Sequence, residues 1–302
     1  MTRFAPALLI SFALLSSASP ARAQAQRDAR AVAVVSQSLS ALAGSTALGD
    51  LTLQGSVAYT AGSDQESGAV TLLASGNRLS NLALNLSGGA RNEIRNGPAG
   101  LWSGPDGVQY PMALHNCWPD ADWFYPGLSF AALSSDPQLG LAYVGPESKD
   151  GLPVIHIQQF RVVPGQTAQV TAQIQALSTE DIYLDASSLL PLFVDYNAHP
   201  DNDFNRNIPV ELGFTAYQRI SGVVIPTHEQ KFFNGTLQLD LSITSAVVNS
   251  GLPPSDFNAT VQNASLKAPP GAVAPVSPPA TRSAGKAAGE DTRATKAAGG
   301  AR

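Results

Sequence analysis

A long succession of short segments with alternating apolar and polar residues constrains the fold more than any other feature of this sequence. In "LTLQGSVAYT", for example, Leu51, Leu53 and Val57 fall on one face of an extended strand, and polar residues fall on the other. Turn-forming pairs such as Gly76-Asn77 separate these segments. We therefore predict one large antiparallel sheet. Its strands would be "LTLQGSVAYT", "GAVTLLAS", "RLSNLALNLS", "ARNEIRNG", "LPVIHIQQFRV", "TAQVTAQIQAL", "TEDIYLD", "PLFVDYN" and "IPVELGFTAYQRI".

The segment 228–243, "HEQKFFNGTLQLDLSI", predicts a β-hairpin, because Asn-Gly separates two extended runs. In a two-residue turn of this kind, Phe233 pairs with Thr236 and Phe232 pairs with Leu237. The second run alternates cleanly, so its apolar residues form one row. That row consists of Leu237, Leu239, Leu241 and Ile243.

Continuing the same register places Gln230 opposite Leu239 and His228 opposite Leu241. A dry core would have to satisfy each of these polar groups or lose about 1–3 kcal/mol per unsatisfied group. Either the apolar row borders a partly hydrated cavity, or the hairpin end protrudes past the core and both side chains reach water. The remaining polar residues of the first run would face water: Lys231 and Glu229.

Two segments depart from the strand pattern. In "QRDARAVAVVSQSLSALAG", Val32, Val35, Leu39 and Leu42 recur at spacings of three and four, which predicts an amphipathic helix that ends at Gly44. The aromatic-rich segment "MALHNCWPDADWFYPGLSFAAL" predicts one or two short helices that pack across the sheet. The predicted fold class is α+β, mostly β, in one domain.

The ends of the chain differ in composition from its middle. Residues 1–25 have the pattern of a secretory signal peptide, with Arg3, an apolar run and small residues near its end. Residues 26–261 would form the domain, and the Pro-, Ala-, Gly- and Lys-rich residues 262–302 a disordered tail. No later apolar run approaches the roughly 20 residues that span a bilayer. We therefore expect a periplasmic or secreted protein without a transmembrane segment in the mature chain.

Charge and cysteine content narrow the range of partners. Residues 26–263 contain 10 Lys and Arg against 21 Asp and Glu, a net charge of −11, which argues against a nucleic acid partner. The single Cys117 cannot form an internal disulfide, so the fold would depend on its apolar core, and the thiol is expected to be inert.

Sequence signals for catalysis or metal binding are weak. There is no nucleophile-elbow, zinc-protease or phosphate-loop motif, and the four histidines are scattered. In "HPDNDFNRN", Asp201, Asp203 and Asn205 alternate as in a calcium loop, but Arg206 stands where glycine is required. His115 and Cys117 could suggest a Cys-His nucleophile, but the sequence shows no group that would orient the histidine. We predict no catalytic residues, no metal and no cofactor.

The C-terminal part of the domain resembles the outer-membrane lipoprotein carrier (LolA/LolB-like) superfamily. The similarity lies in "FTAYQRISGVVIPTHEQKFFNGTLQLDLSITSAVVNSGLPPSDF" and, upstream, in "IYLDASSLLPLFVDY", and the N-terminal helix followed by "LTLQGSV" also fits. The resemblance implies a single bent antiparallel sheet, a half-barrel wrapped over the N-terminal and middle helices, whose apolar concave face receives acyl chains. The matching positions are Tyr217, Gly222, Pro226, Asn249, Pro253 and Phe257.

The resemblance also implies which side chains would line the ligand groove and which would form its lid. Lid residues would come from the aromatic segment, with Trp118 and Phe124 among them. The alternative is that all these residues form a packed core. The predicted lining residues are Leu51, Leu53, Val57, Leu82, Leu84, Leu212, Phe214, Leu237, Leu239, Leu241, Trp123, Phe130 and His228.

The leading functional hypothesis is a periplasmic carrier or binding protein that is not an enzyme and holds a lipid or an acylated protein. The loop "TAGSDQESG" is wholly polar, which argues against insertion of the ligand into a membrane. A sensory or protein-interaction module of the envelope, with a protein partner and the same fold, is the second hypothesis. An uncharacterised hydrolase is the third.

Overall fold

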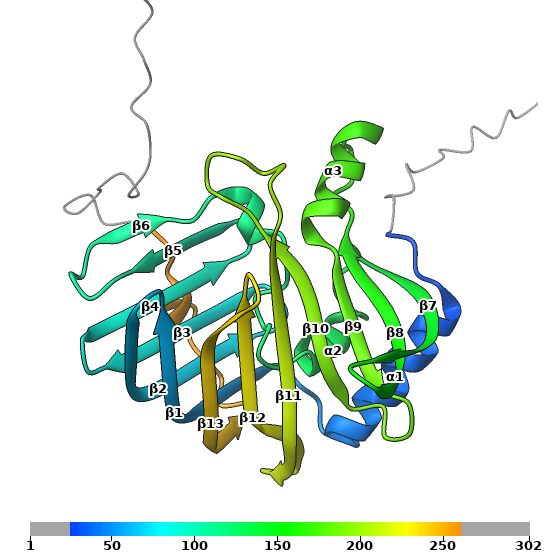
Figure 1. The fold of residues 1–302 in the computed structure, drawn as a ribbon. Coiled ribbons are helices and arrows are strands. Elements are labelled where there is room, and N and C mark those ends of the chain that lie inside the picture. Colours follow the sequence, from blue (N-terminus) through cyan, green and yellow to red (C-terminus); the bar gives the residue numbers. More distant parts are fainter. Residues whose placement is uncertain (1–24, 261–302) are drawn as a thin grey trace, which may run out of the picture. The chain divides into compact units, whose positions relative to one another are not determined.

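The computed structural model describes residues 25–260, which contain one open sheet of thirteen strands (Figure 1). Every pair of neighbouring strands is antiparallel. The predicted fold class, a mostly β fold with one bent antiparallel sheet, is confirmed. The first strands are β1 (Asp50–Ala61), β2 (Asp64–Ser75), β3 (Leu79–Leu86), β4 (Gly89–Asn96), β5 (Ala99–Ser103) and β6 (Gln109–Pro111). The later strands are β7 (Leu139–Lys149), β8 (Leu152–Arg161), β9 (Glu180–Asp185), β10 (Pro191–Ala198), β11 (Ile208–Ile220), β12 (Val223–Phe233) and β13 (Thr236–Val248).

The sheet consists of two meanders that meet at one pairing of strands distant in sequence. Strands β1 to β6 follow one another outward to one edge, and β13 back to β7 follow one another outward to the other edge. Strand β1 pairs with β13 across this junction, with a bulge at Gln54/Gly55. Because both edges stay open, the sheet curves without closing (Figure 1).

Helices α1 (Ala29–Ala43) and α2 (Gly127–Ala132) contribute to the same core as the sheet. The Asp28 side chain accepts a hydrogen bond from the Arg30 backbone N–H at the start of α1, and Gly44 ends the helix with a φ of 59°. Val35 and Leu42 are buried, as the predicted apolar stripe requires. Helix α1 contacts α2, β12 and β7. The short 3₁₀ helices are η1 (Leu114–Cys117) and η2 (Pro254–Phe257).

The prediction of a strand at "TAQVTAQIQAL" is wrong, because the segment forms helix α3 (Ala168–Ser178). Thr167 caps its first turn by accepting a hydrogen bond from the Val170 backbone N–H. Val170 and Ile174 are four residues apart, so one helical face carries both, and Ile174 is buried. Ala and Gln are also better helix formers than strand formers, which outweighs the period-two pattern.

The hairpin β12–β13 has the predicted turn but a different register beyond it. Asn234 and Gly235 have φ values of 51° and 74°, and Phe233 pairs with Thr236 as predicted. A bulge then shifts the pairing by one residue. A shift of one residue exchanges the two faces of a strand. The predicted pairs Gln230–Leu239 and His228–Leu241 are therefore wrong, and the observed pairs are Lys231–Leu239, Gln230–Asp240, Glu229–Leu241 and His228–Ser242.

The bulge places two charged residues of β12 on the inner face of the sheet. Glu229 and Lys231 are buried beside Leu241 and Leu239, although the sequence placed both on the wet face. His228 lies on the outer face, where its imidazole Nε2 is 2.9 Å from Asp240 Oδ1. The interior of the half-barrel is therefore more polar than predicted.

The ends of the chain lie outside the described residues, and with them the predicted signal peptide, apart from residue 25, and the predicted tail from 262 onward. Within residues 25–260, no helix has the length and hydropathy of a membrane span.

Candidate functional site

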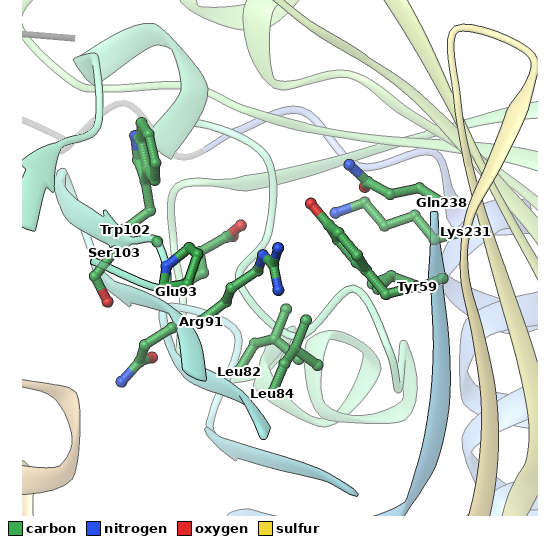
Figure 2. Close-up of a pocket in the computed structure, with 13 residues that line it drawn as sticks. Tyr59, Leu82, Leu84, Arg91, Glu93, Trp102, Ser103, Lys231 and Gln238 are labelled. Carbon is green, nitrogen blue, oxygen red and sulfur yellow. The ribbon is translucent and has the colours of Figure 1, made fainter. Parts of the chain in front are cut away.

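A pocket of about 330 Å³ opens on the inner face of the sheet, between β3–β5 on one side and β1, β12 and β13 on the other (Figure 2). Its apolar surface comes from Leu82 and Leu84 on β3 and from Leu239 on β13. These three residues point inward because side chains alternate along each strand. The cavity is within the usual size of a small-molecule site, about 300–1,000 Å³.

Two aromatic residues form opposite walls of this pocket. Trp102 on β5 stacks on Tyr110 of β6, with ring centroids 4.3 Å apart. Tyr59 on β1 lies under the guanidinium of Arg91, whose Cζ is 4.6 Å from the ring centroid. Stacked and cation–π contacts of this kind fix the side chains, so the walls are preorganised.

Strand β4 adds alternating charges on the inner face. Arg91 Nη2 is 2.6 Å from Glu66 Oε1 on β2, and Arg95 Nε is 3.0 Å from Glu93 Oε1. Desolvation raises the pKa of Glu93, whereas the positive charges of Arg95 and Lys231 lower it. The lowering is the larger effect, so the net shift of the pKa is downward. The Glu93 carboxylate is therefore held ionised in a positive field.

Lys231 projects into the pocket from β12 (Figure 2). Its side chain is deeply buried, and its ammonium nitrogen lies 4.6 Å from the centre of the Trp123 ring. Among the described residues, no carboxylate lies within ion-pair distance of this ammonium. The pocket thus combines an apolar floor with a cation that forms no ion pair, although its charge acts on Glu93 in the same pocket.

A second cavity of about 190 Å³ adjoins the first and shares Glu93, Trp102 and Lys231 with it. Its other lining residues include Arg95 and His199. Together the two cavities can bind an elongated ligand that has an apolar part and a polar part. No group of three or more His, Cys, Asp or Glu residues suited to a metal ion occurs in the described part of the chain.

The structure brings three of the predicted lining residues to the pocket: Leu82, Leu84 and Leu239. The ring of Trp123 lies against Lys231, and Phe130 is buried in α2. Leu237 is half-buried and does not line the pocket, and His228 faces outward. The other predicted residues lie in the packed core, and they are Leu51, Leu53, Val57, Leu212, Phe214 and Leu241.

Sequence reasoning missed the charged residues of the site. Arg91, Glu93 and Arg95 alternate in "ARNEIRNG", and this pattern shows that they share a face but not that the face is internal. Lys231 was missed because the bulge in the hairpin has no clear signal in the sequence.

Cys117 is the last residue of η1 and is buried. Desolvation raises the pKa of its thiol. A thiol with a raised pKa is a weak nucleophile, in line with the inert role expected from the sequence.

No family model matches this chain, and no curated protein matches it in sequence. It is similar to solved structures, of which the first is a DUF1329 family protein from Desulfovibrio piger ATCC 29098, with 11% identity, 78% of this chain and 100% of that chain covered, and a TM-score of 0.48. LolA superfamily protein NE2245 from Nitrosomonas europaea has 11% identity, coverage of 75% and 96%, and a TM-score of 0.48. A putative outer membrane lipoprotein-sorting protein domain from Vibrio parahaemolyticus has 12% identity, coverage of 76% and 96%, and a TM-score of 0.45. At these identities the likeness concerns the fold alone.

Proposed function

We propose that this protein is a periplasmic binding or carrier protein that holds a lipid or a lipidated ligand on the concave face of its sheet. The observation that carries the proposal is the pocket above Leu82, Leu84 and Leu239, where buried leucines at the margin of the core also border an open cavity on the inner face of a curved sheet. Each methylene group that such a surface removes from water contributes about 0.8 kcal/mol. Binding of this kind requires no reaction chemistry.

The size of the pocket limits the ligand in this conformation. The remaining inner-face residues are packed against α1, α2 and the aromatic segment, so the space available is the pocket and the adjoining cavity. We propose that one acyl chain occupies this space. A ligand with several chains would require the aromatic segment around Trp123 and Phe130 to move away from the sheet.

The test fills the pocket from its floor. Leu84 on β3 lines the pocket with its side chain on the inner face, so Leu84→Trp would place an indole ring in the space that the chain would occupy. The matched control is Ser242→Trp, at an exposed position of β13. We expect the unmodified protein and S242W to bind a fluorescent fatty acid, and L84W to lose at least tenfold in affinity.

The same proteins can be extracted with organic solvent after purification from cells, and the extracts analysed by mass spectrometry. Co-purified lipid is expected with the unmodified protein and with S242W, but not with L84W. Absence of lipid from every extract, together with no uptake of the fatty acid, would rule out the proposed function.

A further inference from the structure

Lys231 is an unusual group for the interior of a sheet. Only 7% of the residue is exposed, and its observed partner is the face of the Trp123 ring. The other lysine in the described residues, Lys149, lies 2.7 Å from Asp195 and 2.9 Å from Glu211. A buried charge is costly unless it is paired. The unpaired Lys231 ammonium therefore indicates a place where a negative charge would be stabilised.

Two arginines extend the positive character of this place. A terminal nitrogen, Nη1, of both Arg91 and Arg95 is buried without a hydrogen-bond partner among the described residues. Arg91 and Lys231 extend toward each other from opposite sides of the pocket (Figure 2). Glu66 pairs with Arg91 and Glu93 pairs with Arg95, so two carboxylates face three cations, and Lys231 is the cation that forms no ion pair among the described residues.

This group of cations lies inside a domain whose net charge is negative. The sequence between residues 26 and 263 has a net charge of −11, so an anion is repelled by the protein in general. A cationic group inside such a domain is expected where an anion must be bound at one place. The leucine floor begins directly beside these cations, since Arg91, Lys231, Leu82 and Leu84 line the same pocket.

We infer that the ligand is a single-chain anionic amphiphile whose carboxylate or phosphate group binds between Lys231 and Arg91 while its chain lies on Leu82, Leu84 and Leu239. This inference rests on the proposed lipid-binding function and specifies the chemistry of the ligand. The headgroup replaces the missing acidic partner of Lys231, and the chain replaces water over the leucines. A neutral or cationic headgroup has no such partner.

The test compares ligands that differ only in the headgroup. Dodecanoate, dodecyl phosphate and dodecanol would each compete with a neutral fluorescent probe, N-phenyl-1-naphthylamine, for the full-length mature protein. Lys231→Met removes the charge but retains an unbranched apolar chain, and Lys231→Arg retains the charge. Lys149→Met is the matched control, because Lys149 does not line this pocket.

A hydrogen bond to a charged group contributes enough that its loss weakens binding by about tenfold or more. We expect K231M to bind at least one of the two anions about tenfold more weakly than the unmodified protein while binding dodecanol equally well. K231R and K149M are expected to keep the affinity for the anions. Whether dodecanoate or dodecyl phosphate loses more on K231M identifies the headgroup, carboxylate or phosphate.

Two results would overturn the inference, and they are distinguishable. Equal binding of both anions by K231M and the unmodified protein, with L84W still blocking all ligands, would refute the headgroup site and leave the proposed function intact. Failure of the probe and of every ligand to bind the unmodified protein would refute the proposed function, and the headgroup site with it. Circular dichroism and a urea unfolding curve for each variant establish that the compared proteins are folded.

Discussion

Glu229 on β12 is a carboxyl group in the apolar core, between Phe214 on β11 and Leu241 on β13. Only 1% of the residue is exposed, and neither carboxylate oxygen has a hydrogen-bond partner in the described structure. Desolvation raises the pKa of Glu229 well above its ordinary value. The folded protein therefore binds this proton more tightly than the unfolded chain does.

This difference predicts a stability that depends on pH. Because the folded pKa of Glu229 is raised, its contribution is fully present below the unfolded pKa of about 4.3 and is lost as the pH rises through the folded value. We expect Glu229→Gln, which cannot ionise, to be more stable than the unmodified protein at pH 8 by about 1–3 kcal/mol. The difference should shrink at pH 5.

Urea unfolding at both pH values measures this effect. Asp64→Asn, at an exposed position of β2 that takes part in no ion pair among the described residues, is the control and should leave the pH dependence of the unmodified protein in place. An E229Q curve that runs parallel to that of the unmodified protein between pH 5 and pH 8 would contradict the assignment.

At the scale of elements, a buried polar cluster fixes the aromatic segment to strands β8 and β9. Arg161 on β8 pairs with Asp120, and its Nη1 is 2.9 Å from Asp136 Oδ2. The Glu180 carboxylate on β9 accepts a hydrogen bond from the Asp120 backbone N–H at 2.8 Å. Ser129 Oγ, on α2, lies 2.8 Å from Asp122 Oδ1. These contacts fix the aromatic segment against the strands that carry Arg161 and Glu180.

Removal of the cation at the centre of this cluster tests that role. Arg161→Met leaves buried carboxylates without their partner, and breaking a buried ion pair in this way costs about 3–5 kcal/mol. We expect the free energy of unfolding to fall by that amount and amide hydrogen exchange to rise in residues 114–133. Arg206→Met, in the exposed loop before β11, is the matched control and should change stability by less than about 0.5 kcal/mol. A folded R161M with unchanged stability would contradict the proposal that this cluster fixes the aromatic segment to the sheet.

The elements also show how far local pattern predicts structure. The helix from residue 29 to 43 and the turn at Asn234-Gly235 could be predicted, because periodicity and turn residues act over a few positions. Strand β7 was not predicted, since Gly145-Pro146 interrupts its alternation at the edge of the sheet. The bulge that turns Lys231 inward involves one extra residue and leaves no comparable pattern.

At the scale of the molecule, the sequence predicts the class of the fold but not its interior. Alternating strands joined by short turns predict a meander of neighbouring strands, and the sheet has this order except where β1 meets β13. A leucine row, however, has the same pattern whether it faces a cavity or other side chains. Leu239 and Leu241, two residues apart on the same strand, are both buried in the core, but only Leu239 also borders the pocket. Only the packing of the whole sheet distinguishes them.

The central claim is that a lipid chain lies on the inner face of the sheet at this pocket. Photo-crosslinking with a diazirine analogue of dodecanoate, followed by peptide mapping, tests it most directly. We predict that the label attaches to residues of β3, β5 and β13, at or next to Leu82, Trp102 and Leu239, and that L84W is not labelled there. Labelling confined to exposed positions such as Val144 and Val247, or equal labelling of L84W at the pocket, would contradict the account.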